Sequence, residues 1–389
     1  DFGSSIRFPT FEDSSARTLL QARTKSRFNL ATWLVAGACG LAIALTVIVG
    51  GATAILGMWE RASTAEVPSG PPATAEFVSD EPRLPTLNPA RQDWPQPSAA
   101  IDKTKPVKAF IIAGQPSMAG RVDLTTLQRF AGEIDSAASH SFRLRNQQGW
   151  NERDDVWALA SELHGHATRS GALSVGFGET ANEIGPELGL GHVLGNHFDE
   201  QVVILRISSP PQALGDQFRP ASSDSPGGTA YQALVADVAN ILDEFEKSPN
   251  CQGTGVEVAG LFWIQGMCDG TDPQHRAAYA DNLANLVRDL RKQWHAPAMK
   301  VVIAEFCRAP TGDEPQDPIR KNLQWLQQSH AQVAGQAEFQ DSVRFVTAMH
   351  DINIPSPEAT MTMFHANPRN LLDLGEGCGH AMLELQMRP

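Results

Sequence analysis

From Val107 onward, short apolar runs alternate with longer stretches of helical pattern, and this alternation restricts the fold more than any other feature. The apolar runs are rich in β-branched residues, as in strands that are covered on both faces. They span residues 107–113, 201–208, 256–264, 299–306 and 343–349. Helical patterns span residues 186–197, 229–247, 274–295 and 318–335, and a last helix runs from about Pro368 to Leu385. The order predicts an α/β fold of flavodoxin-like, doubly wound type, with a mainly parallel five-stranded sheet.

An uncharged run covers residues 28–59, ahead of this pattern. About 20 apolar residues suffice to cross a bilayer, so the run predicts one transmembrane helix. A buried helix of a soluble core is the alternative, and such long uncharged runs are rare there. Basic residues precede the run at Arg17, Arg23, Lys25 and Arg27. The positive-inside rule therefore predicts a cytoplasmic segment 1–27 and an extracytoplasmic remainder, in the periplasm or at the cell surface.

The rest of the chain divides into a Pro-rich linker, residues 60–106, and one domain, residues 107–389. The linker composition favours extended backbone that buries no core. A net charge of −13 argues against a nucleic-acid partner. The five cysteines include no C-x-x-C pair, so we expect no metal and no cofactor, while disulfide pairing stays open.

The first predicted strand runs into the sequence AGQPSMAG, residues 113–120. In an open α/β sheet, ligands bind beyond the carboxyl ends of the strands, and this turn follows such an end. The turn resembles the strand-to-helix turn of a hydrolase, in which a nucleophile follows the Gly-Gln pair, here Gly114 and Gln115. Pro116 occupies that position and has neither a nucleophilic group nor a backbone N–H.

Several blocks in the same order resemble the sialate O-acetylesterase-like branch of the SGNH hydrolases, which includes carbohydrate esterase family six. The turn 114–118 is similar to the family's GQSNM. Further similar blocks are IGPELGLGHVLGNHF at 184–198, AGLFWIQGMCDG at 259–270, YADNLANLVRDLR at 279–291 and FHANPRNLLDLGEGCGHAML at 364–383. The resemblance covers nearly all of residues 107–387 and implies the SGNH-hydrolase fold.

The resemblance also implies a chemistry, the removal of acetyl groups from sugars. A Ser attacks the acyl carbon, a His takes its proton, an acid orients the His, and backbone N–H groups hold the oxyanion. In this chain the nucleophile position holds Pro116, and the family's Gly pair is Pro210 and Pro211. The family's C-terminal His matches His365, but Thr362 stands where many SGNH enzymes have an Asp.

Two main hypotheses follow. In the first, the domain is a catalytically degenerate esterase, a pseudoenzyme that binds a glycan or acts as a scaffold. In the second, it is an active O-acetylesterase with a relocated triad of Ser117, His365 and Asp269. A third, a folded spacer in an assembly, requires that side chains fill the site.

Each residue also has a simpler interpretation: Ser117 as the first-turn serine of a helix, Asp269 as a turn residue and His365 as a structural histidine. Gln115 and Gln265 are predicted substrate-contacting residues. Met267 replaces the Glu of the family's Gln-Gly-Glu block and is also predicted to lie at the substrate, although packing is the favoured explanation for a Met there.

The expected partners are an acetylated carbohydrate or glycan and the membrane. The loop GFGETANEIG, residues 176–185, lacks a dinucleotide fingerprint and a phosphate-binding Lys, so we interpret it as a loop near the site.

Overall fold

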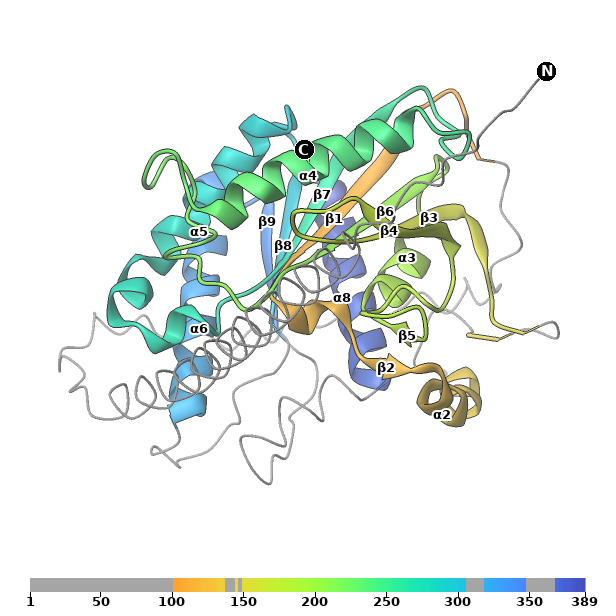
Figure 1. Ribbon diagram of the computed structural model, residues 1–389, viewed down its shortest axis with the longest axis horizontal. Coiled ribbons are helices and arrows are strands. Elements are labelled where there is room, and N and C mark those ends of the chain that lie inside the picture. The colour runs from red at the N-terminus through yellow and green to blue at the C-terminus, as the bar shows by residue number, and fades with distance from the viewer. Residues whose placement is uncertain (1–100, 137–143, 146–148, 306–317, 348–367, 389) are drawn as a thin grey trace, which may run out of the picture. The chain divides into compact units, whose positions relative to one another are not determined.

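The computed structural model describes residues 101–136, 144–145, 149–305, 318–347 and 368–388, which all fall within one compact unit (Figure 1). The predicted span 28–59 and almost all of the predicted linker lie outside the described residues. Within the described ranges, no helix is both long enough and apolar enough to cross a bilayer.

A seven-stranded sheet forms the centre of the domain, in the order β4-β3-β6-β1-β7-β8-β9 (Figure 1). Neighbouring strands are parallel throughout, except that β4 is antiparallel to β3. The strands are β1 (Val107–Gly114), β3 (Arg153–Glu162), β4 (Ala167–Leu173), β6 (Val202–Ser208), β7 (Val256–Ile264), β8 (Lys300–Ala304) and β9 (Val343–Val346).

The predicted five-stranded sheet is therefore too small, although all five predicted strands are present. Sequence analysis missed β3 and β4. β4 is an edge strand whose side chains alternate between half-buried and exposed, and its sequence ATRSGAL contains no apolar run. β3 begins with three charged residues, Arg153 to Asp155, but its next five residues, VWALA, form an apolar run that the prediction overlooked. A second, antiparallel pair joins β2 (Val122–Asp123) to β5 (Glu183–Ile184).

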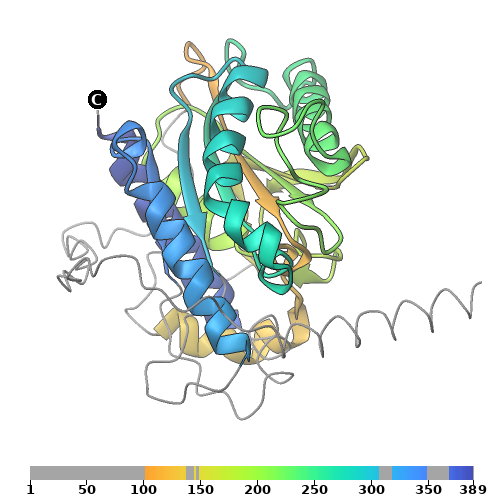
Figure 2. The same ribbon diagram turned by 90° about the vertical axis from the view of Figure 1, so that its left-hand side faces the viewer.

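Helices cover both faces of the sheet, which confirms the doubly wound arrangement (Figures 1 and 2). One apolar cluster includes Leu188 and Leu372 from α3 and α8, and the other includes Leu234 and Leu283 from α4 and α5. The helices are α2 (Leu124–Ser136), α3 (Glu187–Gly195), α4 (Thr229–Glu246), α5 (Pro273–Gln293), α6 (Pro318–Ala334) and α8 (Pro368–Gln386). All except α2 match predicted helices within two residues at each end.

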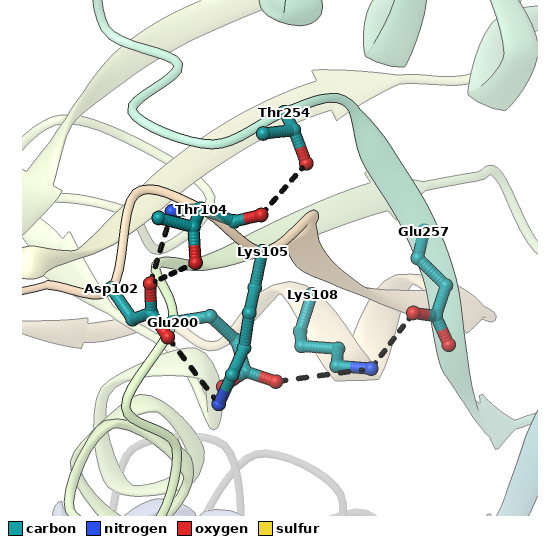
Figure 3. A network of polar contacts seen from close by, with 7 residues as sticks. All are labelled: Asp102, Thr104, Lys105, Lys108, Glu200, Thr254 and Glu257. Carbon is teal, nitrogen blue, oxygen red and sulfur yellow. Dashed lines mark hydrogen bonds and ion pairs between the residues drawn. The ribbon is translucent and has the colours of Figure 1, made fainter.

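At the amino-terminal edge of the sheet, a network of ion pairs fixes the chain just before β1 (Figure 3). Glu200 lies 3.4 Å from Lys105 and 3.8 Å from Lys108, and Lys108 also pairs with Glu257 at 2.8 Å. The Thr254 amide donates to the Lys105 carbonyl at 3.1 Å. These contacts join the starts of β1, β6 and β7 at the edge opposite to the predicted site.

Candidate functional site

Three segments that are far apart in the sequence meet at the carboxyl-terminal edge of the sheet. They follow β1, β6 and β7, which are adjacent strands with β1 in the middle. The Gln115 amide donates to the Ile264 carbonyl at 2.9 Å. The Ser209 hydroxyl contacts the Gly114 carbonyl at 2.5 Å. The sheet therefore brings together the predicted residues Gln115, Pro116, Ser117, Pro210, Pro211, Gln265, Met267 and Asp269, whereas Thr362 and His365 lie outside the described residues.

The segment after β1 forms a 3-10 helix, Pro116–Ala119, with Ser117 as its second residue. Its geometry depends on Gly114, whose φ of +143° is unfavourable for other residues. A Cβ on Gly114 would lie only 2.1 Å from the Ile264 carbonyl oxygen. Proline fits the first position of such a turn because no hydrogen bond from that N–H is needed. The turn therefore forms locally without the backbone donor that Pro116 lacks.

The segment after β6 carries Pro210 and Pro211, both exposed. Neither has an N–H. Three amides further along this loop, those of Ala213, Leu214 and Gly215, are already in use within the protein. The Ala213 amide donates to the Gln217 side chain at 3.1 Å. The Leu214 and Gly215 amides donate to the Asp269 carboxylate at 2.9 and 2.7 Å. Residues 213–215 therefore direct their N–H groups into the fold.

Asp269 joins the ends of β6 and β7. Its side chain is fully buried, and it accepts a third hydrogen bond from Gln265 Nε2 at 2.7 Å. The same Gln265 nitrogen donates to the Gln212 carbonyl at 2.9 Å. Burial raises the pKa of Asp269, and the hydrogen bonds from Gln265, Leu214 and Gly215 oppose that shift. Asp269, which follows β7, therefore holds the β6–α4 loop in place through the Leu214 and Gly215 amides.

The loop 176–185 holds the turn after β1 from the other side. The Glu179 amide donates to the Gly120 carbonyl at 3.0 Å, and the Leu124 amide donates to the Asn182 carbonyl at 2.9 Å. An ion pair between Arg121 and Glu179 adds to these contacts. The loop therefore lies beside the candidate site, in agreement with the interpretation from sequence.

Two buried ionisable residues, Arg206 and Glu187, anchor that loop. Arg206 of β6 donates from Nε to the Phe177 carbonyl at 3.1 Å and from Nη2 to the Gly178 carbonyl at 2.8 Å. Glu187 accepts from the Gly185 amide at 2.8 Å, and its carboxylate lies 4.0 Å from Arg206. Burial raises the pKa of Glu187 to about 7. Sequence analysis did not single out Arg206, although one charged residue inside an otherwise apolar strand is a usable signal.

Met267 is half-buried and packs against both apolar clusters. Its place beside the end of β7 leaves it near the polar groups of the site without an observed polar contact of its own. Within the described ranges, no group of three or more His, Cys, Asp or Glu side chains is arranged to hold a metal ion. At the ends of β1, β6 and β7, the described groups therefore include backbone amides and carbonyls, the Ser209 hydroxyl and the buried Asp269 carboxylate.

The family model for sialic acid-specific acetylesterase carbohydrate esterases matches residues 106–384. A search of curated proteins found no significant match. Among solved structures, a protein of Arabidopsis thaliana is 16% identical with a TM-score of 0.46, over 72% of this chain and 98% of that one. A carbohydrate acetylesterase of Xanthomonas citri is 13% identical with a TM-score of 0.43, over 70% of this chain and 54% of that one. NanS is 12% identical with a TM-score of 0.43, over 74% of this chain and 99% of that one.

The family match covers well over half of the chain. The chain therefore belongs to the carbohydrate esterase family of sialic acid-specific acetylesterases.

Proposed function

We propose that this family member binds an acetylated carbohydrate at the carboxyl-terminal edge of its sheet and does not hydrolyse the ester by the family's route. Acetyl-ester hydrolysis needs a nucleophile and donors for the oxyanion. The residues at the corresponding positions, Pro116, Pro210 and Pro211, supply none of these groups.

Magnitudes support this choice. Loss of a triad nucleophile lowers kcat by roughly a millionfold. Loss of a single oxyanion donor lowers kcat by about a hundred- to a thousandfold. Both defects affect the same acyl-transfer step, so a substitution elsewhere in the domain would not restore hydrolysis.

The hydrogen bonds of the β6–α4 loop are the observation that carries the proposal. A shifted loop would restore catalysis only if a neighbouring amide took over the role of the missing donors. The Ala213, Leu214 and Gly215 amides are instead committed to Gln217 and Asp269. Gln115 suits recognition of a sugar hydroxyl better than stabilisation of an oxyanion, whereas both side-chain N–H groups of Gln265 are engaged by the Gln212 carbonyl and Asp269.

The same proposal includes a membrane tether. The uncharged run 28–59 and the basic residues before it support a single-pass anchor, with the domain on the extracytoplasmic side. Protease added to intact cells should then digest the domain and spare a small N-terminal fragment. Protection of the domain in intact cells would reverse the proposed topology.

Hydrolysis of p-nitrophenyl acetate by the full-length protein tests the catalytic part. We expect wild type and Ser117→Ala to show the same background rate. A wild-type rate that Ser117→Ala abolishes would establish the alternative, an active O-acetylesterase with a relocated nucleophile.

Pro116→Ser sharpens the result, because it returns a hydroxyl and an N–H to the turn. A gain of activity in this variant would show that only the reacting groups are missing. No gain would point to Pro210 and Pro211 as a sufficient block.

A further inference from the structure

A chain of buried hydrogen bonds runs from α6 to the candidate site. The His330 Nε2 lies 3.0 Å from the Tyr279 hydroxyl. That hydroxyl donates to the Gln265 backbone carbonyl at 2.8 Å. The Gln265 side chain then continues to Asp269, which holds the β6–α4 loop. His330, Tyr279 and Asp269 are all fully buried.

The donors in this chain of hydrogen bonds follow from the acceptor character of the Gln265 carbonyl and from the low pKa of His330. A carbonyl oxygen only accepts, so the single hydroxyl proton of Tyr279 points to Gln265. The Tyr279 oxygen must then accept from His330, which requires a proton on Nε2. Burial lowers the pKa of His330 to about 3, so the ring is neutral and its Nδ1 carries no proton. Among the described residues, Nδ1 indeed has no hydrogen-bond partner.

We infer that Tyr279 and His330 are positioning residues of the candidate site, which act through Gln265 and Asp269 to fix the Leu214–Gly215 stretch of the β6–α4 loop. Gln265 is the junction of the chain. Its backbone carbonyl accepts a hydrogen bond from the Tyr279 hydroxyl. Its side-chain nitrogen donates to Asp269 and to the Gln212 carbonyl.

Close packing around Tyr279 restricts the side chains that form these hydrogen bonds. A Cβ on Gly266 would lie 2.9 Å from the Tyr279 hydroxyl and 2.2 Å from a methyl group of Leu326. The Tyr279 ring also packs edge-on against Trp325, with ring centroids 5.3 Å apart. Close packing of this kind transmits a change at α5 or α6 to the end of β7.

The functional meaning of this inference rests on the proposed carbohydrate site, whereas its geometric content is testable without a ligand. Amide hydrogen exchange of the full-length protein reports the order of the loop. In Tyr279→Phe, we expect the peptide covering residues 209–216 to exchange about tenfold faster than in wild type, because one buried hydrogen bond is lost. Peptides from β3 and β4 should keep their wild-type rates.

Tyr231→Phe is the matched control. Tyr231 is the only other tyrosine in the sequence. It is buried in the same apolar cluster as Tyr279 but lies on α4. We expect Tyr231→Phe to leave the exchange of residues 209–216 unchanged. An unchanged rate in Tyr279→Phe, or an equal acceleration in the β3 and β4 peptides, would overturn the positioning role.

Nitrogen NMR of wild-type histidine side chains gives a second test that needs no variant. The His330 signal should show a neutral ring with the proton on Nε2 and no titration between pH 5 and pH 8. A signal that titrates in the ordinary histidine range, or a proton on Nδ1, would contradict the hydrogen bonds assigned to His330 and Tyr279. Neither experiment depends on carbohydrate binding, so a failure here and a failure of the proposed function are separate results.

Discussion

The two edges of the central sheet hold their connecting segments by different means. At the amino-terminal edge, Lys105, Lys108, Glu200 and Glu257 form ion pairs with partly exposed side chains. At the carboxyl-terminal edge, the fully buried Asp269 accepts hydrogen bonds from two backbone amides and a glutamine side chain.

Burial decides how much each network contributes. Exposed ion pairs are screened by water and salt and contribute about 0–1 kcal/mol each. A buried polar group that loses its partner costs about 1–3 kcal/mol, because water cannot replace the lost bond. The carboxyl-terminal edge is therefore the part of the domain where single polar substitutions have large consequences, and the candidate site is built on it.

Asp269→Ala should give the largest effect and provides the strongest challenge to this comparison. The substitution leaves the Leu214 and Gly215 amides and one N–H of Gln265 without their acceptor. We expect the free energy of unfolding to fall by about 3–5 kcal/mol, measured by urea denaturation. A loss below about 1 kcal/mol would mean that water replaces the carboxylate, and the edge would then resemble the amino-terminal one.

A pH series on Glu187→Gln should give the next largest effect. Burial raises the pKa of Glu187 from its ordinary value of 4.5 to about 7. Between these pH values the folded protein keeps a proton that the unfolded chain releases, so this group lowers stability as the pH rises. The stability of the variant relative to wild type should therefore increase by about 3 kcal/mol from pH 4 to pH 8.

Urea denaturation of both proteins across that range measures the difference directly. A difference that is constant with pH would show that Glu187 is ionised throughout this range. Glu187 would then carry no proton in the folded protein.

Glu200→Gln should give the smallest effect, because its partners are partly exposed lysines. We expect the free energy of unfolding to fall by at most about 1 kcal/mol at low salt, and by less at high salt. Lys247→Gln, which removes an exposed ion pair with Asp243 on α4, serves as the surface control. If Glu200→Gln lowered the free energy of unfolding as much as Asp269→Ala, independently of salt, the two edges would not differ in the way described.

Most of the fold was predictable because buried parallel strands leave a continuous apolar pattern. That pattern gave β1, β6, β7, β8 and β9 with nearly correct bounds. It failed for β4, where one side faces solvent, and it was overlooked in β3, where the apolar run VWALA follows three charged residues. Edge strands depend on pairing that only the folded sheet provides, so local composition underestimates them.

The candidate site was predictable only as a set of segments. Sequence analysis placed Gln115, Pro210 and Gln265 at strand ends, and the strand order brings those ends together. It could not reveal that Asp269 binds the Leu214 and Gly215 amides, because such a contact depends on how two loops fold over the sheet edge. It also gave no reason to connect Tyr279 with His330, which are 51 positions apart.

The most direct test of the account is to measure binding and turnover in one sample. Full-length protein is incubated with an O-acetylated carbohydrate while calorimetry records binding and an enzymatic assay records released acetate. We predict saturable binding with no acetate above the rate of the carbohydrate alone. Acetate release by wild type that Ser117→Ala abolishes would contradict this prediction and establish a working esterase.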